Sequence, residues 1–270
     1  MTQTDHAATF KALHQGPEIL VLPNAWDAAS AALMAEAGAK AVATSSAAVA
    51  WAHGYPDGDA LPVGALLATV REIARVLPVP LTVDIEGGYT DDLGELSETV
   101  DRLIDAGVAG INLEDGRRDP ALHARKIEAV KQTAARRHFL LFLNARIDVY
   151  LLGLAEGESA MKSTVSRAAT YRSAGADGIF VPGPVDEPTI GRLVQGIELP
   201  LNVMGRPGAP KAAALQALGV RRLSSATGPF RYAYAALAQA TATYLGEGDP
   251  GAYSVPAGAL PDLNKRFAGG

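Results

Sequence analysis

A short pattern that recurs along the chain limits the folds available to it. A helix-compatible run ends at a glycine, and an apolar stretch typical of a strand begins two or three residues later, at Gly38, Gly107, Gly175 and Gly219. Glycine suits this position because it adopts the left-handed conformation at little cost. In a second version of the pattern, proline ends the helix, at Pro78–Val83 and Glu198–Val203. Repeated alternation of helix and strand predicts a parallel α/β fold.

The repeats predict eight short strands, each next to a helical segment. The expected strands are Ile19–Leu22, Ala41–Thr44, Leu81–Asp84, Gly110–Glu114, Leu140–Asn144, Gly178–Val181, Leu201–Val203 and Arg222–Ser224. The expected helices are Ala28–Ala37, Val63–Val76, Gly94–Ala106, Ala121–Ala135, Met161–Ala174, Glu187–Gln195, Pro210–Leu218 and Phe230–Leu245. Strands that are apolar throughout are typical of a parallel sheet covered by helices. Eight units favour a closed (β/α)8 TIM-type barrel over an open doubly wound sheet, and no Gly-x-Gly-x-x-Gly follows the first strand.

Length and composition agree with a single barrel domain over residues 1–270. The chain has 270 residues and no linker rich in proline, serine or charge, and a barrel of this type needs about 250 residues. Hydrophobic residues make up 48% and charged residues 20%, which excludes disorder, collagen and coiled coil as the main architecture. The net charge of −5 argues against nucleic acid or an anionic membrane as a partner.

Several classes of site and location are also disfavoured. The chain has no cysteine, which excludes disulfides, thiolate metal sites and cysteine nucleophiles. Residues 1–15 are polar and lack the apolar core of a secretory signal. No window of ~18 uninterrupted apolar residues is present to span a bilayer. We therefore expect a cytoplasmic protein that binds neither nucleic acid nor membrane.

Carboxylates follow two neighbouring strands at the ends where a barrel of this kind has its active site. These are Asp84, Glu86 and Glu114, and Arg146 follows the next strand. Nearby anions raise one another's pKa unless a cation neutralises them, and Mg²⁺ prefers oxygen ligands. We therefore expect Asp84, Glu86 and Glu114 to surround Mg²⁺. Arg146 is expected to bind a carboxylate or phosphonate of the substrate in a bidentate manner.

Other polar groups near the strand ends give weaker signals. Ser45, Ser46 and Ala47 are expected to offer backbone N–H and hydroxyl donors to an anion, and Asn202 is expected to add polarity to the pocket. An alternative interpretation is that the acids form salt bridges that cap the barrel. Against this, Gly87 and Gly88 allow the backbone to approach a ligand closely.

Composition alone predicts structural roles for several further residues. Asp57 lies in Gly54-Tyr55-Pro56-Asp57-Gly58 and is interpreted as a turn residue. Tyr89 is expected to pack on its loop, with contact to substrate as the alternative. His53 is expected at the surface or in packing, and His123 and His138 are expected to face solvent.

Taken together, the motifs resemble those of the isocitrate lyase/phosphoenolpyruvate mutase superfamily over most of the chain. Each motif is short, but their order on successive strands is specific. They are Pro23-Asn24-Ala25-Trp26-Asp27-Ala28-Ala29-Ser30, Thr44-Ser45-Ser46-Ala47, Gly54-Tyr55-Pro56-Asp57, Val83-Asp84-Ile85-Glu86-Gly87-Gly88-Tyr89, Ile111-Asn112-Leu113-Glu114-Asp115 and Asn144-Ala145-Arg146-Ile147-Asp148.

The resemblance implies a metal-dependent enzyme and an assembly. It implies Mg²⁺ (or Mn²⁺) at Asp84, with Asp57, Glu86 and Glu114 acting mostly through bound water. It also implies small 2-oxo or 2-hydroxy acids or phosphonates as substrates, held by the backbone near Ser45–Ala47 and by Arg146. The last helix, Phe230–Leu245, is then swapped onto a partner in a homodimer or dimer-based homotetramer, and residues 246–270 form a C-terminal tail. Only on this ground does Asp57 become a site residue.

The chain also departs from the superfamily pattern. Lyases of the superfamily carry a Lys-Lys-Cys-Gly-His or Lys-Arg-Cys-Gly-His loop after the fourth-strand glutamate, and its cysteine transfers a proton. Here the loop is Glu114-Asp115-Gly116-Arg117-Arg118-Asp119-Pro120-Ala121-Leu122-His123. The lysine and Asn-Ser of the phosphonate enzymes are missing from it as well, and Val181-Pro182-Gly183 replaces an acidic residue common in relatives.

Three hypotheses follow. The first is a Mg²⁺-dependent carbon–carbon lyase or decarboxylase that forms an enolate, with Arg146 stabilising charge and a metal-bound water, Tyr89 or Asp57 as proton donor. The second is mutase or hydrolase chemistry on a carbon–phosphorus bond, with Arg117 or Arg118 over the phosphonyl group. The third is a non-catalytic 2-oxoacid-binding protein.

Overall fold

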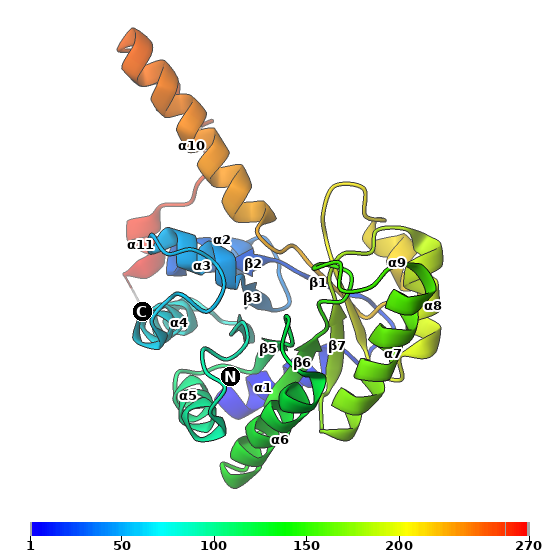
Figure 1. The fold of residues 1–270 in the computed structure, drawn as a ribbon. Helices are drawn as coiled ribbons and strands as arrows, with labels where there is room; N and C mark the ends of the chain where they lie inside the picture. Colours follow the sequence, from blue (N-terminus) through cyan, green and yellow to red (C-terminus); the bar gives the residue numbers. More distant parts are fainter. Residues whose placement is uncertain (1, 257, 269–270) are drawn as a thin grey trace.

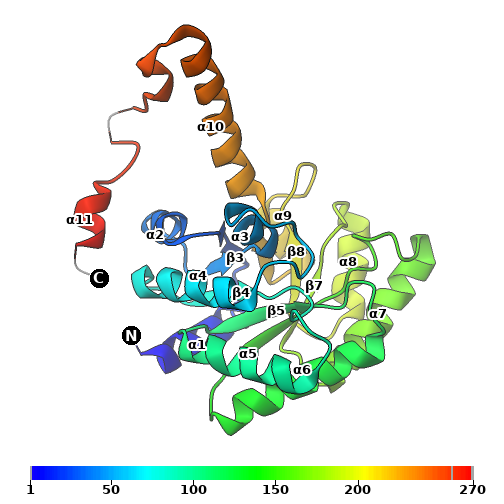
Figure 2. The ribbon, with the colours of Figure 1, turned by 60° about the vertical axis from the view of Figure 1, so that its left-hand side comes forward.

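The computed structural model describes residues 2–256 and 258–268, and its centre is a parallel sheet (Figures 1 and 2). The sheet has nine strands. The strands are β1 (Leu20–Leu22), β2 (Asn24–Ala25), β3 (Val42–Thr44), β4 (Leu81–Asp84), β5 (Gly110–Glu114), β6 (Phe142–Arg146), β7 (Gly178–Val181), β8 (Leu201–Met204) and β9 (Arg222–Ser224). Their order in the sheet is β1-β9-β8-β7-β6-β5-β4-β3-β2. All eight pairings are parallel.

The sheet closes on itself because β1 and β2 are two parts of one strand. Pro23 separates them; its ring nitrogen carries no hydrogen to donate, while its carbonyl oxygen accepts from the Ala43 N–H at 2.9 Å. β1 pairs with β9 and β2 pairs with β3, so the two ends of the sheet meet at this residue. The predicted (β/α)8 TIM-type barrel is confirmed.

Helices alternate with the strands and cover the outside of the barrel (Figure 1). They are α1 (Gln3–Leu13), α2 (Ala28–Glu36), α3 (Ser46–Ala52), α4 (Val63–Val76), α5 (Leu93–Asp105), α6 (Pro120–Arg136), α7 (Gly157–Ser173), α8 (Glu187–Gly196), α9 (Ala212–Leu218), α10 (Gly228–Glu247) and α11 (Leu263–Phe267), with a 3₁₀ turn at Pro250–Tyr253. Aspartates 92, 119 and 186 cap α5, α6 and α8 by accepting from first-turn N–H groups. The apolar core lies between these helices and the strands.

Helix α1 was not predicted, and it closes the end of the barrel opposite the predicted site. Phe10 is fully buried and packs edge-on against Phe142 at 5.5 Å between ring centroids. Gly110 is required beneath it, because a Cβ there would lie 2.6 Å from the Phe10 ring. His14 stacks on Phe142 at 4.0 Å. The sequence at the start of the chain is mostly polar, yet it forms a helix that buries Ala7 and Phe10 on one face.

Helix α10 leaves the body of the barrel, as both views show (Figures 1 and 2). Phe230, in its first turn, is its one buried residue and packs against Trp26 and Trp51. The rest of the helix is largely exposed, whereas α11 returns to the body, where Arg266 pairs with Glu36 of α2 at 2.7 Å. None of the described helices is long and apolar enough to cross a membrane.

Candidate active site

A cavity of about 150 Å³ opens at the carboxyl ends of the barrel strands. Residues from eight of the strands (β2 to β9) or from the segments that follow them line it: Asn24, Ser45, Ser46, Ala47, Asp57, Asp84, Asn112, Arg146, Leu151, Phe180, Met204, Ser224, Ala226 and Thr227. Six of the predicted site residues are in this wall, namely Ser45, Ser46, Ala47, Asp57, Asp84 and Arg146. The structure therefore brings together residues that lie up to about a hundred positions apart.

Arg146 lies between two carboxylates. In the sheet, Glu114 of β5 and Arg146 of β6 are register partners, and Arg146 Nη1 lies 2.6 Å from Glu114 Oε2. Its Nε donates to Asp148 Oδ1 at 2.7 Å, and its guanidinium carbon lies 5.8 Å from the Phe180 ring centre. Burial works against the charge, but Glu114 and Asp148 outweigh it and raise the pKa of Arg146. The guanidinium is thus a permanent cation in the cavity wall.

Asp84 lies beside the first turn of α3. Its Oδ2 accepts from Ser46 Oγ at 3.0 Å, and its backbone N–H donates to Thr44 Oγ1 at 3.0 Å. The Ser45 hydroxyl caps α3 by accepting from the Ala48 N–H at 3.4 Å. Asp57 lies on the rim of the cavity, where partial loss of hydration, followed by the Asp84 charge, raises its pKa.

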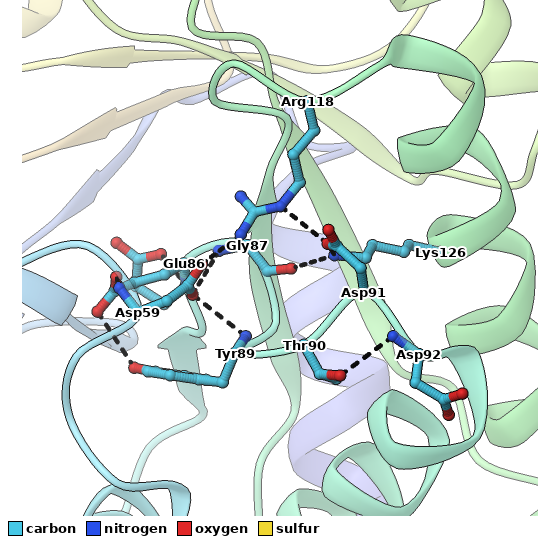
Figure 3. Close-up of polar contacts among 10 residues, drawn as sticks. Asp59, Glu86, Gly87, Tyr89, Thr90, Asp91, Asp92, Arg118 and Lys126 are labelled. Atoms are coloured by element: carbon cyan, nitrogen blue, oxygen red, sulfur yellow. Dashed lines mark hydrogen bonds and ion pairs between the residues drawn. The ribbon is translucent and has the colours of Figure 1, made fainter.

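The turn after β4 holds Glu86 and Tyr89 in a strained backbone (Figure 3). Both have positive φ, 50° and 61°, a region that costs non-glycine residues energy. The Tyr89 hydroxyl donates to Glu86 Oε1 at 3.4 Å, and Asp59 N–H donates to the other oxygen. Burial raises the pKa of Glu86 to about 7, with the charges of Asp57, Asp84 and Asp59 adding to the effect and the Asp59 N–H opposing it. Burial, followed by the charges of Glu86, Asp84 and Asp59, also raises the pKa of Tyr89, so that its hydroxyl keeps its proton.

Three residues that the sequence did not single out for this role fix the same turn (Figure 3). Asp59 Oδ1 accepts from the N–H groups of Gly87 and Tyr89 at 3.2 and 3.1 Å. Arg118 pairs with Asp59 and with Asp91, the latter at 3.0 Å, and its guanidinium lies where a Cβ on Gly87 would be. Lys126, fully buried on α6, donates to the Gly87 carbonyl at 2.9 Å. Arg118 is therefore engaged with Asp59 and Asp91 in this structure.

Comparison with known proteins assigns the chain to a family. Residues 10–245 match the family model described as phosphoenolpyruvate phosphomutase. The chain belongs to this family. An uncharacterized protein of Mycobacterium tuberculosis is 38% identical over 252 residues, 92% of this chain and 93% of that one. The 2-methylisocitrate lyase of Bacillus subtilis is 29% identical over 213 residues, 74% of this chain and 67% of that one.

A solved structure agrees in fold with this member of the phosphoenolpyruvate phosphomutase family. The "putative phosphonomutase" of Burkholderia cenocepacia has a TM-score of 0.83 and 39% identity, and the match covers 87% of this chain and 98% of that one. The predicted superfamily is confirmed, and the relatives are lyases and mutases. The chain is therefore an enzyme of the isocitrate lyase/phosphoenolpyruvate mutase superfamily.

The carboxylates expected around a cation lie near the cavity but do not form a ready three-ligand group. Within residues 2–256 and 258–268, no cluster of three or more histidine, aspartate or glutamate side chains is arranged to hold a metal ion. Glu114 is paired with Arg146, and Glu86 is engaged in its turn. Asp84 alone of the three lines the cavity. The donor set nevertheless fits Mg²⁺. Asp57 and Glu86 lie near the buried Asp84 carboxylate, whose charge adds to the effect of burial in raising their pKa values. Mg²⁺ commonly takes one direct carboxylate plus waters.

Other site residues differ from expectation. Asn202 lies inside the barrel, where its Oδ1 accepts from Ser224 Oγ at 3.2 Å, and it is not part of the cavity wall. The prediction that His123 faces solvent is wrong: His123 is fully buried on the inner face of α6, edge-on to Tyr171 at 4.6 Å, whereas His138 is exposed as expected. Asn24, Asn112, Phe180 and Ser224 were missed as wall residues, although Asn24 and Asn112 stand in the motifs that carry the resemblance.

Proposed function

We propose that the protein is a Mg²⁺-dependent carbon–carbon lyase or decarboxylase acting on a small 2-oxo or 2-hydroxy mono- or dicarboxylic acid. The observation that carries this proposal is the small cavity in which Asp84 and Arg146 share one wall. Its volume of about 150 Å³ corresponds to roughly five water molecules, which suits an acid of the size of pyruvate or oxaloacetate. Larger substrates such as nucleotides do not fit this space.

The proposed chemistry needs positive charge beside the reacting carbonyl. Breaking a bond next to a 2-oxo group leaves an enolate, and Arg146 contributes a fixed cation to its stabilisation. A bound Mg²⁺, with Asp84 as direct ligand and Asp57, Glu86 and Glu114 nearby, would supply Lewis-acid stabilisation of the same charge. The backbone N–H groups of Ser46 and Ala47 are available for a substrate carboxylate because first-turn N–H groups lack helical partners. The Ser45 hydroxyl accepts from the Ala48 N–H and keeps its own hydrogen to donate to the substrate, whereas the Ser46 hydroxyl donates to Asp84.

For proton transfer we favour Asp57 over Tyr89. Asp57 lines the cavity, and its raised pKa helps it to carry a proton. The Tyr89 hydroxyl instead points to Glu86 and is not in the cavity wall. Tyr89 then acts by holding Glu86 in place.

The metal and the reaction are tested with a panel of acids. We expect turnover of oxaloacetate or a 2-methylisocitrate-type acid in Mg²⁺ that EDTA abolishes and that Asp84→Asn lowers at least a thousandfold. Full activity in EDTA would refute the metal. Phosphate release from phosphonopyruvate would favour the carbon–phosphorus alternative suggested by the family model, although Arg118 is not free for it. Thermal stabilisation by the acids without turnover would indicate a binding protein.

We also propose that α10 packs on a second copy of the chain. The side chains that α10 exposes include Tyr232, Leu237 and Leu245, with 83%, 53% and 77% of their surfaces accessible. An apolar groove of about 510 Å³ lies open where α2 faces β1 and β9, and Val21, Met34 and Leu223 line it. Apolar patches of this kind mark interfaces. Exchange of α10 between two copies would cover both surfaces, in a homodimer or a dimer-based homotetramer.

A further inference from the structure

We propose that Asn112 is a further substrate-binding residue and that the buried Arg222 is the positioning residue that fixes its amide. In this arrangement the Asn112 side chain donates an N–H to a carboxylate or carbonyl oxygen of the bound acid. The inference rests on the proposed function, because it assumes that the cavity binds such an acid.

Asn112 occupies a central place in the cavity wall. It lies on β5, where its register partner on β4 is Asp84 and its register partner on β6 is Asn144. Its side chain is almost entirely buried, yet it forms part of the cavity surface. The Asn112 side-chain amide is therefore positioned between Asp84 on one neighbouring strand and Asn144 on the other.

Two donors fix the orientation of the Asn112 amide. Asn144 Nδ2 donates to Asn112 Oδ1 at 3.0 Å, and Arg222 Nη2 donates to the same oxygen at 3.2 Å. A guanidinium has donors only, so the atom facing it must be the amide oxygen and not the nitrogen. Within residues 2–256 and 258–268, Asn112 Nδ2 donates to no protein atom and is not shut off from solvent. Its N–H groups are thereby left for an acceptor in the cavity.

Arg222 is difficult to explain as a structural residue. It is completely buried, its guanidinium carbon lies 6.0 Å from the Phe10 ring centre, and its Nε and Nη1 have no partner among the described residues. A buried cation without a carboxylate partner destabilises a fold, and an apolar side chain of similar volume is often as stable or more so. The hydrogen bond to Asn112 is the one that its guanidinium makes within the described chain, which points to a role at the cavity.

Binding of oxalate in the presence of Mg²⁺, followed by titration calorimetry, tests the inference in the intact protein. We expect Asn112→Asp, which has the same shape but no donor, to weaken oxalate binding at least tenfold. Arg222→Met should weaken it three- to tenfold while its unfolding midpoint stays equal to or above that of the wild type. With a turned-over acid, both changes should appear mainly in KM. Thr82→Val, which alters another buried polar group outside the cavity wall, is the control and should bind as the wild type does.

Wild-type affinity in Asn112→Asp would overturn the donor role, and wild-type affinity in Arg222→Met would overturn the positioning role. If the wild type itself binds no oxalate, the proposed function fails. The contact between Arg222 and Asn112 is then tested by the unfolding midpoint instead of by binding. Asn112→Asp should then lower the unfolding midpoint less when Arg222 is present than in the Arg222→Met background, because the new carboxylate pairs with the guanidinium. Equal losses in the two backgrounds would refute the contact.

Discussion

Arg146 shows how one side chain serves the structure and the site together. Its planar guanidinium reaches Glu114 with one nitrogen and Asp148 with another, and the residue still forms part of the cavity wall. A lysine ammonium is a point charge and does not reproduce this fork. Asp148 is fixed in turn, because its N–H donates to the buried Asp115, which also binds Arg167 and Tyr171. The cation that the proposed chemistry needs is thus held by a chain of buried contacts.

His123 is the residue at which we expect acid to act on stability. Burial lowers its pKa from 6.5 to about 3, so the unfolded chain binds more protons between these values. The free energy of unfolding therefore falls as the pH drops below 6.5, by about 2 kcal/mol at pH 5. We expect His123→Phe, measured by urea unfolding at pH 7.5 and pH 5, to reduce the pH-dependent loss by this amount. Burial also lowers the pKa of His14 to about 3. Because His14 is still present in the variant, part of the decrease in the free energy of unfolding at low pH should remain.

The exposed His138 supplies the control for this experiment. His138→Asn suits its φ of 49° and should leave the difference between the two pH values unchanged. A His123→Phe protein that loses as much stability between pH 7.5 and 5 as the wild type would show that His123 is not the group that titrates.

At the scale of elements, the turn after β4 depends on Arg118 from the loop after β5. Gly87→Ala tests this dependence, because its Cβ would displace the Arg118 guanidinium, now 2.1 Å from that position. The lost ion pairs are partly exposed, so we expect the free energy of unfolding to fall by only about 1 kcal/mol. Activity should fall at least tenfold, since Glu86 and Tyr89 lose their support. Gly64→Ala, in open space on α4, is the matched control and should leave activity unchanged. A fully active Gly87→Ala enzyme would contradict this role for Arg118.

The elements that could be predicted from the sequence are those with a clear local signal, such as a glycine or proline before an apolar run. All eight expected strands form, because glycine or proline marks most of their starts and their residues are apolar. The strand expected at Leu140–Asn144 forms as β6 and begins at Phe142, since pairing with β5 starts there, and this register places Arg146 beside Glu114. Helices α1 and α3 were missed because their sequences are polar or rich in alanine and serine.

His123 was misplaced because its helix face is set by the neighbouring α7. The spacing of residues along the chain does not reveal side chains that make their contacts in a loop or inside the barrel. These side chains are Asp59, Arg118, Lys126 and Arg222.

At the scale of the whole molecule, the outer face of the barrel at β1 and β9 is open, and α10 leaves the body of the barrel. In a barrel the helix after the last strand normally covers the outer face next to the first strand. Here α10 points away from that face, and Val21 of β1 remains 54% exposed. The two apolar surfaces, helix and groove, belong to the same chain but do not cover each other. A closed symmetric pair of chains satisfies both at once, because each contributes a helix and a groove.

The size of the particle in solution tests this proposal. We expect light scattering at micromolar concentration to give the mass of two or four chains. Leu237→Arg on the helix and Val21→Glu in the groove should each shift the protein toward the mass of one chain, because a charge is buried without a partner at either surface. Lys162→Glu, at an exposed residue of α7 that belongs neither to α10 nor to the groove, is the control and should keep the wild-type mass. A wild-type particle of one chain would refute the exchange of α10. A stable assembly that tolerates both substitutions would place the interface on another face of the barrel.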